Sequence, residues 1–253
     1  MSDPMIQPAA EATPGLSQMQ RVTSVFSAPS KTFDDINRGN KSWWMPFLIM
    51  IVIGYIFFAA ITVKVGWNQV AQNAINMNPK SQERMAQATP EQRETSMKFT
   101  QYAMEGGFAA SPVIVLIVVA LGSLVLMGTI NFGFGGKARF GEVFAMWMYA
   151  SLPGIIKTLL GTIVLFAGSA PDSFNLNNFA PTNVGAFLNP AETNAALYKF
   201  ASALDFTTIW SMVLLGIGLA TVARVKRSSG YIAVFAWWAI IVLLGVGIAA
   251  VTG

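Results

Sequence analysis

Five stretches of the sequence are apolar over the length needed to cross a bilayer. They cover residues 44–64, 110–132, 142–168, 206–224 and 230–251. Roughly 20 predominantly apolar helical residues span about 30 Å of hydrocarbon. Because backbone polar groups inside lipid need internal partners, such runs are expected to be helices. The sequence therefore predicts an all-α integral membrane protein with five transmembrane helices in one bundle.

The composition agrees with a membrane protein and excludes much of catalysis. Charged residues make up 11% of the chain, whereas soluble domains carry about 25%. The chain has no Cys and no His, which removes thiol nucleophiles, the commonest metal ligand and the commonest general base. None of the 12 carboxylates falls well inside an expected span. We expect a protein that is not an enzyme, with no cofactor, no metal and no nucleic-acid partner.

Three regions follow from the pattern of the chain. Residues 1–15 bury too little apolar surface to fold and are expected to be a disordered tail. Residues 16–43 are expected to form a cytoplasmic amphipathic or interfacial helical segment. The remaining residues, 44–253, form the five-span membrane domain, with an extramembrane helical loop at 65–109 and a second long loop at 169–205.

The segment before the first span carries an apolar stripe at helical spacing, from Leu16 through Val22 to Phe26. A second helix is predicted to start at Pro29 and to end near Gly39. The first helix can lie on the cytoplasmic leaflet or pack beneath its own bundle, and the sequence leaves both open. The residues expected to contact the interface or a partner are Phe26, Pro29, Phe33, Trp43, Trp44 and Pro46.

The two long loops differ in character. Within residues 65–109 the sequence predicts two short helices outside the membrane, and Thr89 with Gln92 matches a capping box for the second. Residues 168–190 are dense in Asn, Pro, Gly and Phe, so we expect irregular structure resting on the interface. Helical spacing resumes over residues 191–205.

Lys and Arg in the flanks of the spans predict the orientation. A cytoplasmic N-terminus places nine of these residues inside and six outside, and the two short loops contribute five to the inside count. We expect the N-terminus in the cytoplasm and the C-terminus outside. The inside set is Arg21, Lys31, Arg38, Lys41, Lys137, Arg139, Arg224, Lys226 and Arg227.

The order of these features resembles the Yip (Ypt-interacting protein) domain family of polytopic membrane proteins. The matching residues are "VFSAPSKTFDDI", "WWMPFLI", Pro153 of "YASLPGII" and "LDFTTIWSMVLLGIGLATV". The resemblance implies a cytoplasmic N-terminus and five spans. The acidic, Tyr-containing element that precedes the first span in the eukaryotic, Rab-associated branch is missing, so Rab binding is not expected. The chain is more similar to the bacterial branch, which implies the bacterial cytoplasmic (inner) membrane.

Two classes of function are compatible with the sequence. The first is a non-enzymatic scaffold or adaptor whose cytoplasmic N-terminal region engages lipid or partner proteins. The second is a subunit of a small-anion or lipid transporter or channel, with Lys157 in the pathway. The sequence identifies no partner beyond the lipid bilayer, a membrane or cytoplasmic protein, or a second copy of the chain.

Lys157 lies near the middle of an apolar run, where a cation is costly. Pro153 cannot donate a hydrogen bond to the carbonyl of Tyr149, one turn earlier. A helical side chain points toward the N-terminus of its helix, so Lys157 points toward this break. We expect a polar plug inside the bundle; snorkelling to the headgroups and a transport site are the alternatives.

Small residues four apart mark the last two spans. The pairs are Gly216 with Ala220 and Gly245 with Ala249. Such ridges let helix backbones approach closely in lipid. The sequence predicts that spans four and five pack on each other here, with homodimer contact as the alternative.

Overall fold

The computed structural model describes residues 15–252, so the tail expected over residues 1–15 lies almost wholly outside the described part. The described chain is built from helices and short turns, without named strands. The helices are α1 (Gln18–Ser27), α2 (Pro29–Asn37), α3 (Trp44–Lys64), α4 (Trp67–Asn76), α5 (Pro79–Gln87), α6 (Pro90–Ala109), α7 (Ser111–Gly128), α8 (Phe140–Ala150), α9 (Gly154–Phe166), α10 (Ala195–Ala203), α11 (Phe206–Ala223) and α12 (Arg227–Thr252). A π-helical turn, η1 (Thr129–Gly133), extends α7.

Five helical segments within residues 15–252 are long and apolar enough to cross a membrane. They are Trp44–Lys64, Ser111–Gly133, Phe140–Phe166, Phe206–Ala223 and Arg227–Val251. Each coincides within a few residues with an expected run. The expectation of an all-α membrane protein with five spans is therefore confirmed.

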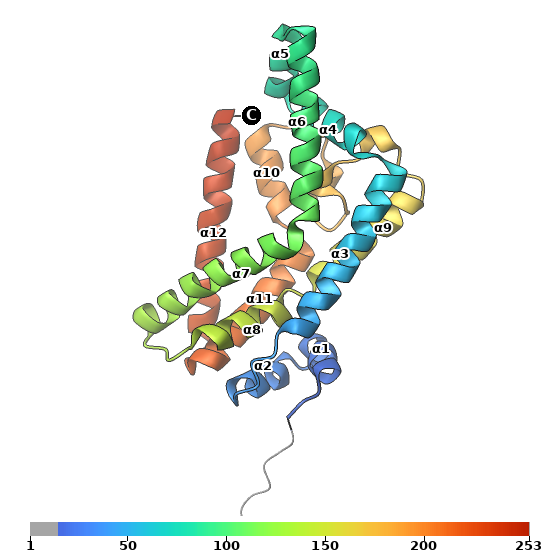
Figure 1. Ribbon diagram of the computed structural model, residues 1–253. Helices are drawn as coiled ribbons and strands as arrows, with labels where there is room; N and C mark the ends of the chain where they lie inside the picture. The colour runs from blue at the N-terminus through green and yellow to red at the C-terminus, as the bar shows by residue number, and fades with distance from the viewer. Residues whose placement is uncertain (1–14, 253) are drawn as a thin grey trace, which may run out of the picture.

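The third segment is interrupted at Pro153. Helix α8 ends at Ala150, and α9 starts at Gly154. The two helices run in different directions in Figure 1. Proline lacks the N–H that a continuous helix needs at this position, which accounts for the break. Helix α8 lies in the main core, whereas α9 packs mainly against α3.

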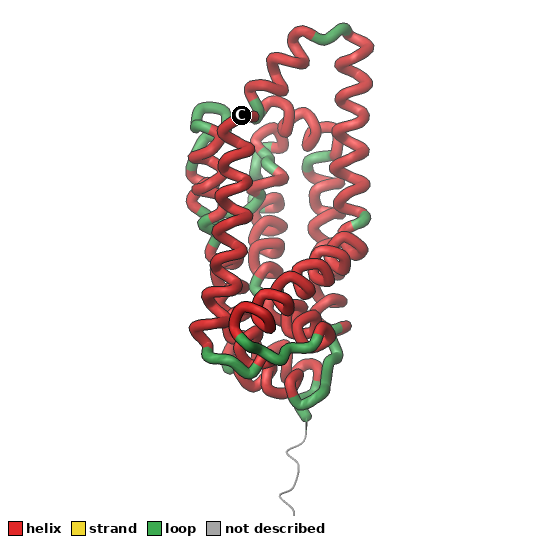
Figure 2. The backbone as a smooth tube through the Cα atoms, turned by 90° about the vertical axis from the view of Figure 1, so that its left-hand side faces the viewer, coloured by secondary structure: helices red, strands yellow, loops and turns green. Residues whose placement is uncertain are grey.

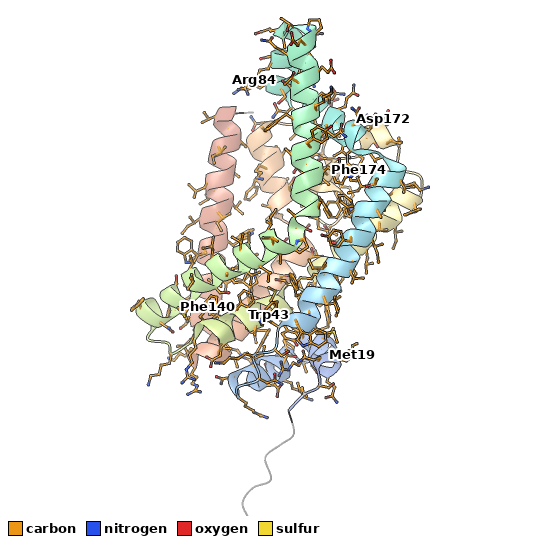
Figure 3. All side chains as sticks on the ribbon, viewed as in Figure 1. Met19, Trp43, Arg84, Phe140, Asp172 and Phe174 are labelled. Carbon is orange, nitrogen blue, oxygen red and sulfur yellow. The ribbon has the colours of Figure 1, made fainter. Side chains whose placement is uncertain are left out.

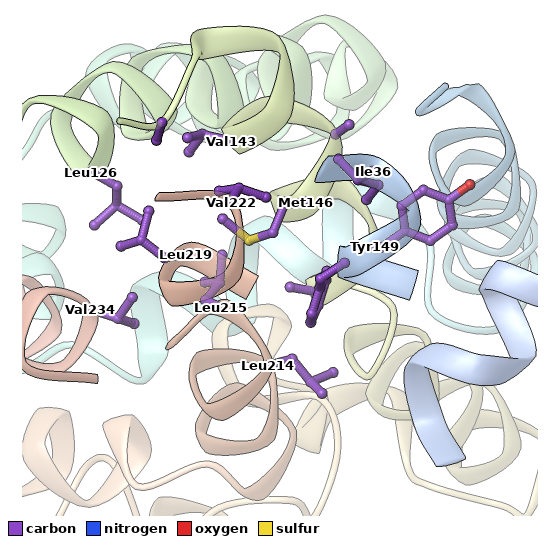
Figure 4. Packing of buried hydrophobic residues seen from close by; sticks show 14 of the residues in the cluster. Ile36, Leu126, Val143, Met146, Tyr149, Leu214, Leu215, Leu219, Val222 and Val234 are labelled. Atoms are coloured by element: carbon purple, nitrogen blue, oxygen red, sulfur yellow. The ribbon is translucent and has the colours of Figure 1, made fainter. Parts of the chain in front are cut away.

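The main core lies at the end of the bundle that carries α1 and α2. Helix α11 packs against α2, α8 and α12, and α1 packs against α2 and α8 (Figure 1). Figure 4 shows the side chains at its centre, where Ile36 of α2 lies with Met146 and Tyr149 of α8 and Leu219 of α11. All four are fully buried. The first two helices are therefore part of the folded bundle.

The first long loop contains three helices rather than the predicted two. Helix α4 was missed, because its polar Asn and Gln residues mask a face on which Trp67, Val70 and Ala71 are buried. The capping box of Thr89 and Gln92 begins α6 as expected. Helix α6 has 20 residues and leads directly into α7. Figures 1 and 2 show α5 and the first turns of α6 projecting beyond the other helices.

The second long loop folds onto the bundle through short 3-10 turns and then α10. Its Phe174 and Phe179 join Phe57 of α3 and Trp67 of α4 in a separate apolar cluster. The ring centres of Phe57 and Phe179 lie 4.6 Å apart. Asn73 of α4 donates to the carbonyls of Pro171 and Phe174 at 2.7 and 2.9 Å. Aromatic packing and backbone capping thus fix this loop against helices. Its expected position at the membrane interface stays a prediction.

Candidate functional site

Lys157 forms an ion pair with Asp205. Its Nζ lies 3.0 Å from Asp205 Oδ2, and it also sits 5.4 Å from the centre of the Phe179 ring. The Lys157 side chain is 22% exposed and that of Asp205 is 3% exposed. The pair therefore joins α9 to the start of α11, with a ring from the second long loop against it.

Asp205 is held by several donors besides Lys157. It caps α11 by accepting from the backbone N–H of Thr208 at 3.0 Å. The hydroxyls of Thr207 and Thr182 each donate to it at 2.6 Å. Burial by itself would raise the pKa of Asp205, but these hydrogen bonds and the Lys157 ammonium outweigh it and hold the pKa well below its usual range. Asp205 is therefore a fixed anion.

The contact expected between Lys157 and the Tyr149 carbonyl is not the one observed. That carbonyl accepts from the backbone N–H of Leu152 at 3.2 Å, within the tight turn that precedes Pro153. This hydrogen bond within the turn satisfies the Tyr149 carbonyl, so the Lys157 ammonium pairs with a different group. Asp205 is 48 positions away and stands at the start of a span. Its only sequence signal is its place as an acidic helix cap.

A second ion pair, deeply buried, lies between α1 and α2. Arg21 Nε donates to Asp35 Oδ2 at 2.6 Å, and the Arg21 and Asp35 side chains are 0% and 6% exposed. Arg21 also donates to the Ser42 carbonyl at 3.3 Å, and its guanidinium lies 5.9 Å from the Tyr149 ring centre. Sequence reasoning treated Arg21 as a topology charge and missed this role. The pair ties the two helices to the start of α3 and to α8.

The apolar stripe of α1 faces the bundle. Val25 is fully buried, and Val22 and Phe26 pack against the same core. The Phe26 ring meets Trp210 of α11 edge-on, with ring centres 5.6 Å apart. Only Met19 of the stripe is largely exposed, at 57%, and Figure 3 places it at the edge of the molecule. Of the two readings the sequence left open, packing beneath the bundle is the one observed.

The other expected interface residues are divided by burial. Phe33 and Pro46 are buried inside the chain, which removes them from any accessible partner surface. Pro29 begins α2 and is half-buried. Trp43 is also half-buried, whereas Trp44 is 49% exposed at the start of α3. Only Trp43 and Trp44 occupy positions that are typical of residues at a membrane boundary.

The first small-residue ridge lies between α11 and α12. A Cβ on Gly230 of α12 would come within 3.0 Å of Ala220, and a Cβ on Gly216 would meet the Tyr231 ring. The second ridge behaves differently, because Gly245 lies near the stem of Lys199 in α10 and Ala249 lines a polar groove. The first ridge is used within the chain, and the second packs toward α10 instead of α11.

Charge is divided unevenly between the two ends of the described chain. The end with α1 and α2 carries the nine cations counted above and three acids, Asp34, Asp35 and Glu142. The opposite end carries six cations and six acids, apart from the Lys157–Asp205 pair. No group of three or more potential metal ligands occurs among residues 15–252. The described charges therefore mark a basic end and a neutral end.

Comparison with known proteins assigns the family. The Yip1 domain model matches residues 23–249, which extends from α1 to α12. The chain belongs to the Yip1 domain family. The chain is similar to the membrane protein YknW of Bacillus subtilis (strain 168), with 24% identity over 219 residues that cover 87% of this chain and 85% of YknW. No solved structure matches.

The Yip1 match includes most of the structural features described above. It covers the break at Pro153 and both partners of the Lys157–Asp205 pair. It also includes the buried Asp35, although it begins two residues after Arg21. The protein is thus a membrane-embedded Yip1-family chain similar to a bacterial membrane protein.

Proposed function

We propose that this chain is a non-enzymatic membrane adaptor that holds partner proteins through its extramembrane helices. The observation that carries the proposal is the helical arm formed by α5 and α6. Neither helix contains a fully buried residue. Both are nevertheless anchored, because α6 leads into α7 and Tyr55 of α3 donates to the Ala109 carbonyl at 2.8 Å. Met104 and Phe108 near the end of α6 pack against the apolar cluster of Phe57 and Trp67, so the ordered surface left for a partner is α5 and the first turns of α6.

The outward face of α1 and α2 is the second surface of this adaptor. Since the apolar faces of these helices are used within the bundle, the face left for a cytoplasmic partner is polar. It presents Lys31, Asp34 and Arg38, all exposed. The Arg21–Asp35 pair fixes this face relative to the spans. A polar surface held in a fixed position favours a protein partner over insertion into lipid.

Photo-crosslinking in native membranes tests the adaptor proposal. A photoreactive residue is placed in the full chain at Glu83 or Gln87 of the arm, or at Lys31 of α2, all exposed. The matched control is Leu243 of α12, which is 66% exposed on an apolar helix. We expect a discrete protein adduct from an arm or α2 position and only lipid adducts from Leu243. Equal lipid labelling at every position, with no protein adduct, would reject the adaptor.

The transporter alternative has less support. The Lys157 ammonium is committed to Asp205 and to the Phe179 ring, so it does not present a free charge to a passing anion. We expect no anion flux above background in proteoliposomes that contain either the wild type or Lys157→Met. Flux that is present in the wild type and lost in Lys157→Met would favour the transporter.

A further inference from the structure

A small groove lies where α3 and α8 begin, at the basic end of the molecule. It has a volume of about 320 Å³ and is lined by Lys41, Trp43, Phe140, Gly141 and Phe144, here called the Lys41 groove. Figure 3 labels Trp43 and Phe140 toward the end of the molecule that carries α1 and α2. Pockets of about 300 Å³ or more with apolar walls and a few polar groups are typical ligand sites. The Lys41 groove has this composition.

The walls of the Lys41 groove are aromatic. The Phe144 ring packs edge-on against Trp43, with ring centres 5.2 Å apart, and lies 5.7 Å from Phe140. Phe140 is 39% exposed, whereas Phe144 is 9% exposed. Aromatic side chains at the start of a span are typical of the boundary between headgroups and acyl chains. Such an apolar wall is suited to the glycerol and upper acyl chain of a lipid.

A cation lies at the rim of this apolar wall. The stem of Lys41 crosses Gly141 so closely that a Cβ on Gly141 would lie 3.3 Å from Lys41 Cδ. The ammonium is 3.6 Å from Glu142 Oε1, beyond the 2.7–2.9 Å of a charge-assisted hydrogen bond. Glu142 Oε2 instead accepts from the Arg139 backbone N–H at 3.1 Å. Among the described residues the Lys41 ammonium makes no hydrogen bond, so its donors remain for a ligand.

The charges around the groove favour an anion. Lys137 and Arg139 are exposed and directly precede Phe140 in the chain. Glu142, three residues after Arg139, is 6% exposed and accepts from the Arg139 backbone. Among residues 15–252, this end carries nine cations against three acids. An occupant of this groove should therefore combine a negative headgroup with an apolar body.

We propose that the Lys41 groove binds an anionic phospholipid. The headgroup contacts Lys41 and Arg139, and the glycerol and upper acyl chain lie along Trp43, Phe140 and Phe144. Each Lys or Arg near an anionic surface contributes about fivefold in affinity. Two such cations therefore predict a preference of roughly 20- to 30-fold for an anionic over a zwitterionic lipid of equal chain length.

Native mass spectrometry of the full chain in detergent tests this site. The probes are phosphatidylglycerol and phosphatidylcholine with identical acyl chains. We expect the wild type to retain phosphatidylglycerol more strongly, and Lys41→Gln/Arg139→Gln to lose most of the preference. Lys41→Arg should keep it. Gly141→Leu fills the groove at constant charge and should weaken phosphatidylglycerol binding as well.

The matched control removes two cations at the opposite end. Lys98→Gln/Lys199→Gln changes the net charge equally, since both residues are exposed there, and should keep the preference. Elution profile and thermal unfolding establish that each variant is folded. The proposal is overturned by equal wild-type affinity for the two lipids or by an equal loss in the control variant. Competition by free glycerol phosphate at the concentration of the lipid, or a dimer that blocks lipid binding, would also overturn it.

Discussion

At the scale of single residues, two ion pairs, one fully and one partly buried, connect separate helices. Lys157 and Asp205 join α9 to the cap of α11, and Arg21 with Asp35 joins α1 to α2. A charge removed from water is tolerated when a partner and further hydrogen bonds surround it. Each pair has such donors, from Thr182 and Thr207 in the first case. The pairs are therefore structural contacts whose loss should be measurable.

Lys157→Met should destabilise the protein by about 3 kcal/mol, because it leaves the buried Asp205 carboxylate without its cation. Asp205→Asn keeps an oxygen for the α11 cap and should cost less. Thermal unfolding in detergent of both single variants and the double variant measures the coupling. We expect the double variant to lose less than the two single losses combined. Strictly additive losses would show that the two residues do not interact.

The loss caused by Asp205→Asn should not change between pH 5 and pH 8. The pKa of Asp205 lies below its unfolded value of about 4, so its contribution is complete above that value. The contribution is lost only as the pH falls through the lower, folded pKa. Unfolding temperatures of the wild type and Asp205→Asn at both pH values provide the test. A difference that changes across this range would contradict a carboxylate that stays ionised.

At the scale of elements, the close approach of α11 and α12 depends on small residues. A Cβ on Gly230 would meet the Gly216 carbonyl oxygen, so the backbones are nearly in contact there. In lipid, such packing replaces the hydrophobic driving force between helices. A side chain at this position must push the two helices apart.

Gly230→Ala should therefore destabilise the bundle by about 1–3 kcal/mol, the range for overpacking. The control is Gly247→Ala in the same helix, where an added Cβ has no neighbour within 4 Å. Thermal unfolding in detergent should show a lowered midpoint for Gly230→Ala and an unchanged one for Gly247→Ala. Equal midpoints for the two variants would mean that α11 and α12 adjust without cost.

At the scale of the whole molecule, the uneven charge distribution predicts how the protein is oriented in the membrane. Lys and Arg concentrate at the end with α1, α2 and the two short loops, which is expected to face the cytoplasm. With this orientation, the arm of α5 and α6 lies on the outer side of the membrane. This orientation remains a prediction.

Single cysteines test the orientation cleanly, because the chain has no native Cys. Ser173→Cys and Ser228→Cys introduce exposed thiols at opposite ends. With a membrane-impermeant maleimide on intact cells, we expect labelling at Ser173→Cys alone. Ser228→Cys should react only after permeabilisation. The reverse pattern would invert the topology and place the arm in the cytoplasm.

The sequence by itself determined the spans, the family resemblance and the helix starts with clear caps. These follow from local signals. Examples are the length of the apolar runs, the capping box at Thr89, and Pro153, which breaks its helix whatever surrounds it. The tertiary structure decided which charge meets which partner. Lys157 finds Asp205 rather than the Tyr149 carbonyl because the second long loop and the start of α11 fold against α9.

The same division applies to α1. Its periodicity gave an apolar stripe, but lipid and a protein core offer that stripe the same kind of surface, so periodicity does not distinguish them. The contacts with Trp210 and Tyr149, more than 120 residues along the chain, distinguish them in the folded protein. Such contacts depend on how distant helices pack, which no local pattern encodes.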